Sequence, residues 1–314
     1  MSACVLCGSP SFAPLFCASD RLYHTTSKEF AVVRCGECGL VRLHPAPPPE
    51  ELHLYYPENY WFLPDASAAG RMEERYRRLV LRDHVQFVST ALRASRAHGP
   101  ILDAGCGGGL FLGMLRERGF RVLGLDNSDN AARIAWRQQG APSVCAALDA
   151  APFAPHTVAC VTMFHVLEHL YDPRVYLRAA HELLVPDGRL IVQVPNLASW
   201  QFRIFGRAWN GVDVPRHLFD FRSRDLERLL ESCGFTIVRR KFFSLRDNPA
   251  GLASSLAPSL DPMARRVRRI REGPAARLAK DLVYLSIVAA SLPFTLLEAA
   301  FGAGSTVMIE ARPR

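Results

Sequence analysis

The sequence lacks a hydrophobic segment that would by itself carry a chain into or across a membrane. Its first 20 residues contain cysteines and no apolar core segment, which is not the pattern of a secretory signal. The charge-free run at residues 282–297 is shorter than the roughly 20 residues that a spanning helix needs, and Pro293 interrupts it. We therefore expect a cytoplasmic location, with association at a membrane surface as the alternative.

Without an export signal, the nine cysteines point to a reducing compartment, where metal binding is commoner than disulfide formation. Four of them form two Cys-x-x-Cys pairs, Cys4 with Cys7 and Cys35 with Cys38, and glycine directly follows three of the four. Four thiolates from two such turns make a closed tetrahedral site that suits structural zinc and has no open position for catalysis. The pattern predicts a zinc ribbon over residues 1–45; scattered structural cysteines are the alternative.

The centre of the sequence, residues 99–128, reads as a strand, a glycine-rich turn, a helix and a second strand that ends on Asp126. This is the order of elements in the nucleotide-binding half of a doubly wound sheet. A dinucleotide-binding turn also has glycine at its sixth position, which is Leu110 when counted from Gly105. Asp103 would repel a diphosphate, but it suits an ammonium group. The turn therefore favours a nucleoside ligand without phosphate; a glycine turn of another α/β protein is the alternative.

This strand–Asp-Ala-Gly-Cys-Gly-Gly-Gly–helix unit, followed by an acid, resembles the first two motifs of class I S-adenosylmethionine (SAM) methyltransferases. The resemblance implies a Rossmann-like, seven-stranded α/β sheet over residues 99–314. It also implies that the turn binds the amino-acid end of SAM, the acid after the second strand binds the ribose, and the loop after the third strand flanks the adenine. The residues assigned to SAM are Asp103, Gly105, Cys106, Gly107, Gly109, Asp126, Asn127, Leu148, Asp149 and His165.

A histidine motif follows the fourth apolar strand, residues 158–164. The sequence His165-Val-Leu-Glu-His169 resembles the His-x-Leu-Glu-His signature at this position in many small-molecule methyltransferases. Because ligands bind at the carboxyl ends of parallel strands, His165 is predicted to face SAM or the acceptor. Glu168 and His169 lie about one turn further on, and a hydrogen-bonded pair at a helix start is the alternative for them.

The stretch after the fifth strand (189–194) contains Trp200, Phe202, Phe205 and Trp209, and a Pro-Arg-His segment follows them. A helix is predicted next, over residues 223–233, and this fold usually inserts acceptor-binding residues between the two. We expect His217 to be exposed there and to act as the general base, with His165 as the second candidate. The alternative for His217 is a side chain that pins the loop. Arg216 could bind an acidic or phosphorylated acceptor.

Residues 46–98 are predicted to connect the ribbon to the SAM domain. They begin with a proline-rich break and end with an amphipathic helix over residues 71–93. Between the two, aromatic residues are dense enough either to attach the ribbon to the main domain or to cover a pocket. These residues are Tyr55, Tyr56, Tyr60, Trp61 and Phe62.

The last two predicted strands, 235–243 and 305–311, are separated by about 60 residues, too many for a plain loop, so we predict a helical insertion over residues 240–303. Residues 265–280 contain seven basic residues and one acid, which places much of the net charge of +8 there. A basic segment beside a short apolar one suits peripheral membrane contact through residues 261–300, or a lid over an apolar substrate. A helix packed on the sheet or in a dimer is the alternative. Nucleic acid is disfavoured, because aromatic residues are not interleaved with the arginines.

The chain is thus identified as a member of the class I SAM-dependent methyltransferases with an N-terminal zinc ribbon, and its expected cofactors are SAM and structural Zn²⁺. The expected reaction transfers a methyl group to oxygen or carbon of a small-molecule acceptor: a sugar, a quinone-like compound, a polyketide or a lipid-linked compound. Because the sulfonium is already electrophilic, the protein supplies alignment, exclusion of water and one base. An RNA or protein methyltransferase and a non-catalytic SAM-fold binding protein are the alternatives. The oligomeric state is not predicted.

Overall fold

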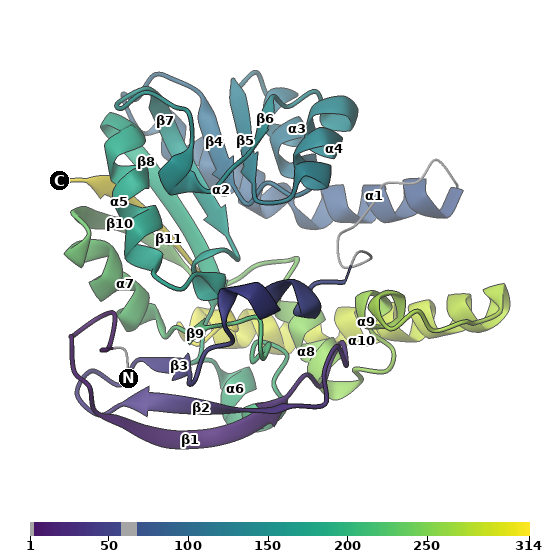
Figure 1. Cartoon of the computed structure of the whole chain (residues 1–314). Coiled ribbons are helices and arrows are strands. Elements are labelled where there is room, and N and C mark those ends of the chain that lie inside the picture. The colour runs from purple at the N-terminus through teal and green to yellow at the C-terminus, as the bar shows by residue number, and fades with distance from the viewer. Residues whose placement is uncertain (1–2, 58–67) are drawn as a thin grey trace.

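A computed structural model describes residues 3–57 and 68–314 of the chain (Figure 1). Its larger sheet consists of β4 (Ile101–Ala104), β5 (Val122–Asp126), β6 (Ser143–Cys145), β7 (Val158–Phe164), β8 (Leu184–Pro195), β10 (Phe235–Lys241) and β11 (Thr306–Pro313). The strand order is β10-β11-β8-β7-β4-β5-β6. The five strands from β8 to β6 are parallel, and β11 is antiparallel to both of its neighbours. The predicted seven-stranded sheet is confirmed.

The two faces of this sheet carry separate hydrophobic cores. Successive side chains of a strand point to opposite faces, so Ile101 and Ile191 lie in one core while Leu102 and Leu190 lie in the other. Three helices cover the first core and two cover the second (Figure 1). The first three are α2 (Arg82–Arg93), α3 (Leu110–Arg116) and α4 (Asp129–Gln139), and the other two are α5 (Pro173–Leu183) and α7 (Ser223–Ser232).

The helix predicted over residues 71–93 is two helices, α1 (Ala68–Val80) and α2, which part at Leu81. In α2, Val85 and Val88 are fully buried against the sheet, whereas Leu79 in α1 is 49% exposed. Only the second half of the predicted helix therefore packs on the core, and the chain turns where that packing begins.

A smaller, four-stranded sheet lies beneath the carboxyl ends of the parallel strands (Figure 1). Its strands, in spatial order, are β1 (Phe12–Ser19), β2 (Glu29–Cys35), β3 (Val41–Leu43) and β9 (Phe219–Asp220). The first three belong to the predicted ribbon, but β9 comes from the stretch before α7. The buried side chains of this sheet also join the core under α5 and α7. The N-terminal segment is thus packed as part of the main body.

The short helices η1 (Pro49–Tyr55), η3 (Leu148–Ala150), η4 (Leu167–His169), α6 (Trp200–Phe205) and η5 (Gly206–Ala208) occupy the loops. The predicted insertion is confirmed, because α8 (Asn248–Leu256), α9 (Pro262–Val267) and α10 (Pro274–Ala300) lie between β10 and β11. Pro293 was expected to interrupt the apolar run, but α10 continues through it. Pro293 and Ala289, whose carbonyl loses its partner, are both exposed, so water can satisfy that carbonyl.

Candidate functional site

The predicted SAM-binding turn lies between β4 and α3, at the carboxyl edge of the parallel strands. Gly105, Gly107 and Gly109 all have positive φ angles, of 83°, 51° and 75°. A Cβ atom on Gly109 would lie 2.6 Å from the Cβ of Ala135, whereas one on Gly107 would meet nothing within 4 Å. Gly109 therefore allows α3 to pack closely on α4, and Gly107 leaves an open stretch of backbone that a ligand can approach.

Asp126 joins this turn from the end of β5. Its Oδ2 accepts a hydrogen bond from the N–H of Gly107 at 2.9 Å, and its Oδ1 accepts one from the N–H of Ser128, also at 2.9 Å. Burial raises the pKa of Asp126, and these two backbone hydrogen bonds oppose the shift. Each carboxylate oxygen has a further lone pair, so Asp126 fixes the turn and can still accept hydrogen bonds from a ligand.

Asp103 at β4 is only 4% exposed, and its Oδ1 accepts a hydrogen bond of 2.6 Å from the hydroxyl of Thr162. Burial raises the pKa of Asp103 to about 7; the Thr162 hydrogen bond opposes this, and the charge of Asp126 adds to it. A cationic ligand at this position would stabilise the carboxylate form. The environment of Asp103 is thus suited to an ammonium group.

Four of the other residues assigned to SAM differ in whether their side chains are exposed or buried. The side chain of Cys106 lies in the core under α2 and α3, so only its backbone faces the turn. Asn127 is exposed at the end of β5. In η3, Leu148 is 2% exposed and Asp149 is exposed. The roles of these four residues stay predictions.

His165 comes directly after β7 and has a φ of 56°, which is uncommon for a residue other than glycine. Its Nδ1 lies 3.1 Å from Oε1 of Glu168, and its Nε2 lies 3.6 Å from Oδ2 of Asp247. Burial acts to lower the pKa of His165, but the two carboxylates outweigh it and raise the pKa to about 9. The two carboxylates therefore favour the protonated form of His165, and that form suits charge stabilisation better than proton acceptance.

Sequence reasoning missed Asp247, which stands at the start of the insertion. Its Oδ2 accepts hydrogen bonds from Nε2 of Gln193 at 2.7 Å and from the hydroxyl of Ser244 at 2.6 Å. Charge interactions with Arg246 and His165 hold its pKa well below the usual range despite burial. An acid just before a helix resembles an ordinary capping residue, so the sequence contained no signal for this position.

His217 is only 8% exposed, so its predicted exposure is wrong. The N-terminal sheet covers this loop, since β9 pairs with β3. The ring of His217 lies edge-on to that of His169, with centroids 4.7 Å apart. Its Nδ1 is 3.0 Å from the carbonyl of Gly211. Because a carbonyl can only accept, Nδ1 carries the hydrogen and Nε2 keeps its lone pair. Burial and the neighbouring His169 lower the pKa of His217 to about 4, so the ring is neutral and can accept a proton.

Four side chains here form what we call the histidine cluster: His165, Glu168, His169 and His217. Glu168, His169 and His217 each place one potential ligand atom within 4.8 Å of the others, close enough to relay a proton or to hold a metal ion. The cluster adjoins the glycine turn, because a Cβ atom on Gly105 would lie 2.7 Å from Cγ2 of Val166. The structure thus brings the two predicted catalytic histidines and the predicted SAM turn together.

Arg216 does not face this site, and its expected role in binding an acidic acceptor is wrong. It is fully buried, with Nη2 2.8 Å from Oδ1 of Asp20 and Nε 3.0 Å from the carboxylate of Asp213. Its Nη1 also donates to the carbonyl of Tyr55 at 3.2 Å. Arg216 therefore anchors the ribbon and the connector to the loop that carries His217.

The connector aromatics that the structure describes contact both the ribbon and the site. Tyr55 is buried, and its ring lies edge-on to Phe30 of β2 at 6.1 Å. The hydroxyl of Tyr56 lies 3.0 Å from Nδ1 of His169 in the histidine cluster. The other aromatic residues that were expected to attach the ribbon or to cover a pocket, Tyr60, Trp61 and Phe62, lie outside the described residues.

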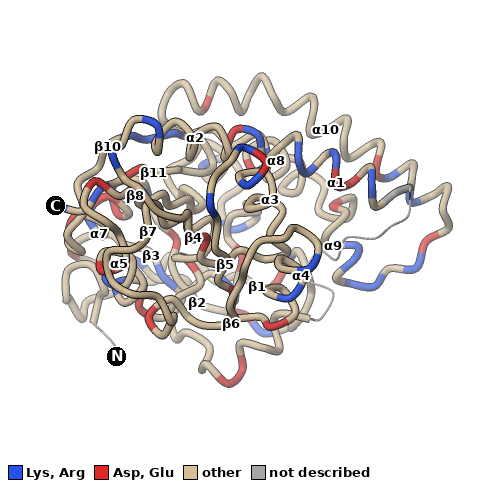
Figure 2. The backbone as a smooth tube through the Cα atoms, turned by 90° about the horizontal axis from the view of Figure 1, so that it is seen from above, with Lys and Arg blue, Asp and Glu red and all other residues tan. Residues whose placement is uncertain are grey.

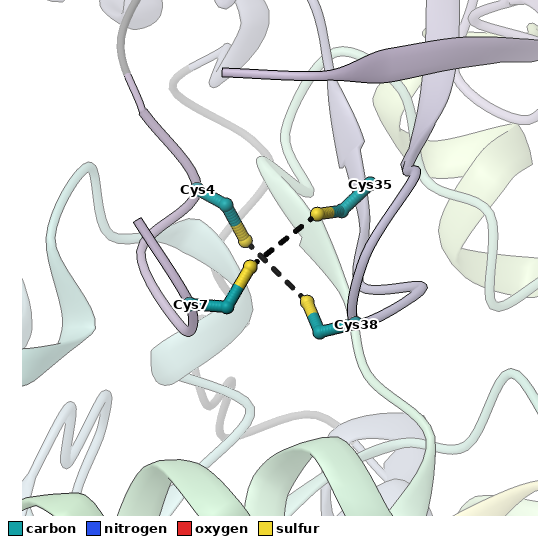
Figure 3. A group of neighbouring side chains, drawn as sticks. All are labelled: Cys4, Cys7, Cys35 and Cys38. Carbon is teal, nitrogen blue, oxygen red and sulfur yellow. Dashed lines mark hydrogen bonds between the residues drawn. The ribbon is translucent and has the colours of Figure 1, made fainter. Parts of the chain in front are cut away.

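The four cysteines of the two Cys-x-x-Cys pairs point toward a common centre (Figure 3). Their sulfur atoms all lie within 4.8 Å of one another, and Cys4–Cys38 and Cys7–Cys35 are each separated by 3.6 Å. Four thiolates held at 2.3 Å around a tetrahedral zinc ion would be about 3.8 Å apart. The set therefore fits a four-coordinate metal, and its sulfur atoms are too far apart for disulfides.

Known proteins resemble this chain in the region of the site. A family model described as a methyltransferase domain matches residues 72–240. A ubiquinone biosynthesis O-methyltransferase of Pseudomonas paraeruginosa is 30% identical over 138 residues, or 41% of this chain and 60% of that protein. A protein of the same name from Pseudomonas fluorescens is 28% identical over 181 residues, or 54% of this chain and 77% of that protein. A solved SAM-dependent methyltransferase from Archaeoglobus fulgidus aligns with 78% of this chain and 100% of that chain, at 18% identity and a TM-score of 0.49.

The matched range contains the glycine turn and the whole histidine cluster, and it covers more than half of the 314 residues. The match to the first of the ubiquinone-biosynthesis proteins spans 60% of that protein's length. This overlap does not show that the two proteins share an activity. The extent of the family match shows that this chain belongs to the methyltransferase-domain family.

Proposed function

We propose that the protein transfers a methyl group from SAM to an oxygen or carbon atom of a small-molecule acceptor. One observation carries this proposal: an open glycine turn, bounded by Asp103 and Asp126, lies next to the histidine cluster. Among the expected acceptor classes, a quinone-like phenol is favoured by the names of the related ubiquinone biosynthesis O-methyltransferases.

In the proposed complex, Asp103 and the backbone at Gly107 hold the amino-acid end of SAM, and Asp126 accepts hydrogen bonds from the ribose. The acceptor atom attacks the methyl carbon while the bond from that carbon to sulfur breaks, and S-adenosylhomocysteine leaves. The acceptor's proton passes to Nε2 of His217, which is neutral in the free protein. The cationic His165, next to this site, stabilises negative charge that develops on the acceptor.

We also propose that Cys4, Cys7, Cys35 and Cys38 bind structural Zn²⁺ and that residues 1–45 form a zinc ribbon. The support is the tetrahedral spacing of the four sulfur atoms. A closed site of this kind takes no part in methyl transfer. Its role is to fix the ribbon, which in turn contacts the acceptor loop through Arg216 and β9.

The first test is calorimetric titration of the full-length protein with SAM, with NAD as the control ligand. We expect SAM to bind and NAD to give no heat. Asp126→Ala removes the ribose acceptor and loosens the turn at Gly107, so SAM binding should be lost. The matched control is Asp129→Ala, three residues away, whose carboxylate is 62% exposed and pairs only with Arg133 within the described structure. Binding of NAD, or unchanged SAM affinity in Asp126→Ala, would contradict the proposal.

The second test follows the transfer of labelled methyl from SAM to a catechol-type phenol, to total RNA and to total protein. Label in the phenol or in another small molecule supports the proposal. Label only in RNA or protein would indicate a polymer acceptor. SAM binding without transfer to any acceptor would indicate a non-catalytic SAM-binding protein.

A further inference from the structure

Helix α10 exposes apolar residues and buries polar ones, which is the opposite of the pattern in a surface helix of a soluble protein. Surface helices bury apolar residues and expose polar ones. The four residues of α10 that are buried all carry a polar group: Tyr284, Ser291, Thr295 and Glu298. Apolar residues occupy the outer face, and those among them that are large and exposed are Leu278, Leu282, Val283, Leu285, Leu296 and Leu297, with Phe301 just beyond the helix.

The polar residues fix the helix in this orientation. The hydroxyl of Tyr284 lies 2.9 Å from that of Ser254 in α8, and Oε1 of Glu298 accepts a hydrogen bond of 2.7 Å from Gln201 in α6. These two attachments are 14 residues, or roughly 21 Å, apart along the helix. Helix α10 is therefore held against the domain along much of its length and is not free to turn its apolar face inward.

The outer face forms one continuous stripe. Leu278, Leu282, Leu285 and Leu296 recur at intervals that place them on the same side of a helix, and each is at least 43% exposed. Figure 2 shows that α10 runs along the edge of the molecule, outside the sheet. Contiguous exposed apolar surface of this kind marks an interaction site rather than an ordinary protein surface.

The charges at the N-terminal end of α10 indicate what the stripe contacts. Exposed Arg269 and Arg271 precede the helix in the loop coloured blue in Figure 2, with Ile270, 45% exposed, between them. The nearby acid, Glu272, is already paired with the buried Arg265 at 2.8 Å and with Lys280 at 2.5 Å. The positive charge of the loop is therefore left to attract an anionic surface.

We propose that α10 and the loop before it dock the protein on an anionic lipid bilayer, with the helix lying parallel to the membrane plane. The leucine stripe enters the boundary between headgroups and acyl chains, and Arg269 and Arg271 contact anionic headgroups. By length and composition alone α10 could also cross a membrane. The attachments through Tyr284 and Glu298 leave only one face for lipid and favour the surface-bound arrangement.

Docking in this way would bring the candidate active site near the bilayer. Asp247, which contacts His165, directly precedes α8, and α8 holds Tyr284 of α10 through Ser254. The docking proposal does not depend on the chemistry of methyl transfer and would stand if the acceptor were different.

The test is flotation of the full-length protein with phosphatidylcholine vesicles that contain or lack phosphatidylglycerol. We expect flotation with the anionic vesicles and much less with the neutral ones. Raising the salt to 1 M shortens the Debye length from about 10 Å at 0.1 M to about 3 Å and should reduce binding. Wild-type protein that stays at the bottom of the gradient with anionic vesicles at low salt would overturn the proposal.

Variants separate the apolar and electrostatic contributions. Leu282→Glu with Leu285→Glu should reduce binding to both vesicle types, and Arg269→Glu with Arg271→Glu should reduce binding to anionic vesicles by at least about tenfold. The matched control is Val238→Glu on β10, which places the same charge at an apolar residue outside the stripe that is 48% exposed. SAM titration and thermal melting of each variant confirm that it is folded.

A second copy of the chain is the competing occupant of the stripe. Sedimentation at several protein concentrations distinguishes it. A dimer that the leucine variant dissociates, together with vesicle binding that the same variant leaves unchanged, would show that the stripe pairs two copies and would overturn the proposal.

Discussion

The two acids of the glycine turn differ in how far the fold already satisfies them. Asp126 accepts hydrogen bonds from two backbone N–H groups, which hold its carboxylate in place. Asp103 accepts a hydrogen bond from the Thr162 hydroxyl, and its pKa is raised to about 7. The fold thus holds Asp126 in place as a hydrogen-bond acceptor. The charged form of Asp103 would be stabilised by a bound cation.

This difference predicts how SAM binding depends on pH. Below about pH 7, Asp103 is neutral in the free protein and must lose a proton to pair with the ammonium group of SAM. SAM affinity should therefore fall on acidification, by roughly tenfold per pH unit once the pH is well below 7. Calorimetric titrations across this range measure the slope.

The control for the pH dependence is Asp103→Asn, which removes the titrating group. It should bind SAM weakly and with little change between acidic and neutral pH. Wild-type affinity that is constant across this range would contradict the assignment of Asp103 to the ammonium group.

His217 can be tested separately as a base and as a loop-pinning residue. His217→Ala should retain SAM binding and slow transfer by roughly 10²- to 10⁴-fold. His217→Asn provides an amide that can replace the bond from Nδ1 to the carbonyl of Gly211 but has no equivalent of Nε2. If His217 is the base, both variants are slow in single-turnover assays. Recovery of the wild-type rate in His217→Asn would indicate a pinning role instead.

At the scale of elements, the junction between the ribbon and the loop that carries His217 depends on Arg216. Arg216→Met would leave Asp20 (1% exposed side chain) and Asp213 without their buried partner. Breaking a buried pair in this way should cost about 3–5 kcal/mol of unfolding free energy. Urea denaturation monitored by fluorescence measures the change.

The matched control for the junction is Arg133→Met on α4. The Arg133–Asp129 pair also joins an arginine to an aspartate at 2.8 Å, but both side chains are more than 60% exposed. Its loss should cost less than about 1 kcal/mol. A comparable loss in the two variants would show that burial does not set the strength of the junction.

The elements that the sequence predicted correctly are those with local signals. The glycine turn, the apolar strands and the two Cys-x-x-Cys turns are each determined by neighbouring residues, and each is found in the structure. The pairing of β9 with β3 and the approach of Asp247 to His165 join segments far apart in the sequence. No periodicity marks such contacts, and an isolated two-residue strand has no pattern of its own.

The wrong predictions have a related cause. His217 and Arg216 were expected at an exposed site because charged and polar residues in loops usually face solvent. Here the N-terminal sheet covers that loop, so both side chains are buried. Their burial depends on a long-range contact with the ribbon, which local sequence does not report.

At the scale of the whole molecule, zinc removal should affect the two ligand sites differently. The proposed SAM site lies at the edge of the large sheet, so SAM should keep its affinity. Transfer should slow, because the ribbon supports the loop that carries His217. The support includes a bond of 3.0 Å from Nη2 of Arg222 to the carbonyl of Cys38. SAM titration and single-turnover transfer, before and after chelation, measure the two effects.

Cys35→Ser should reproduce the effect of chelation, and Cys17→Ser, which changes an exposed cysteine outside the cluster, should not. Loss of SAM binding together with the metal would show that the ribbon and the SAM turn are not separable in this way.

The pairing of β9 with β3 also limits how this protein can be recombined with its relatives. A strand that follows the histidine cluster in the sequence completes the N-terminal sheet, so the structural unit does not coincide with a continuous piece of sequence. If only the first 45 residues were exchanged, the new ribbon would have to pair with the original β9. Arg216 would also lose Asp20, the partner that the original ribbon supplies. The unit that can be transplanted is discontinuous and includes residues 213–222, so these two regions are expected to change together as the family diverges.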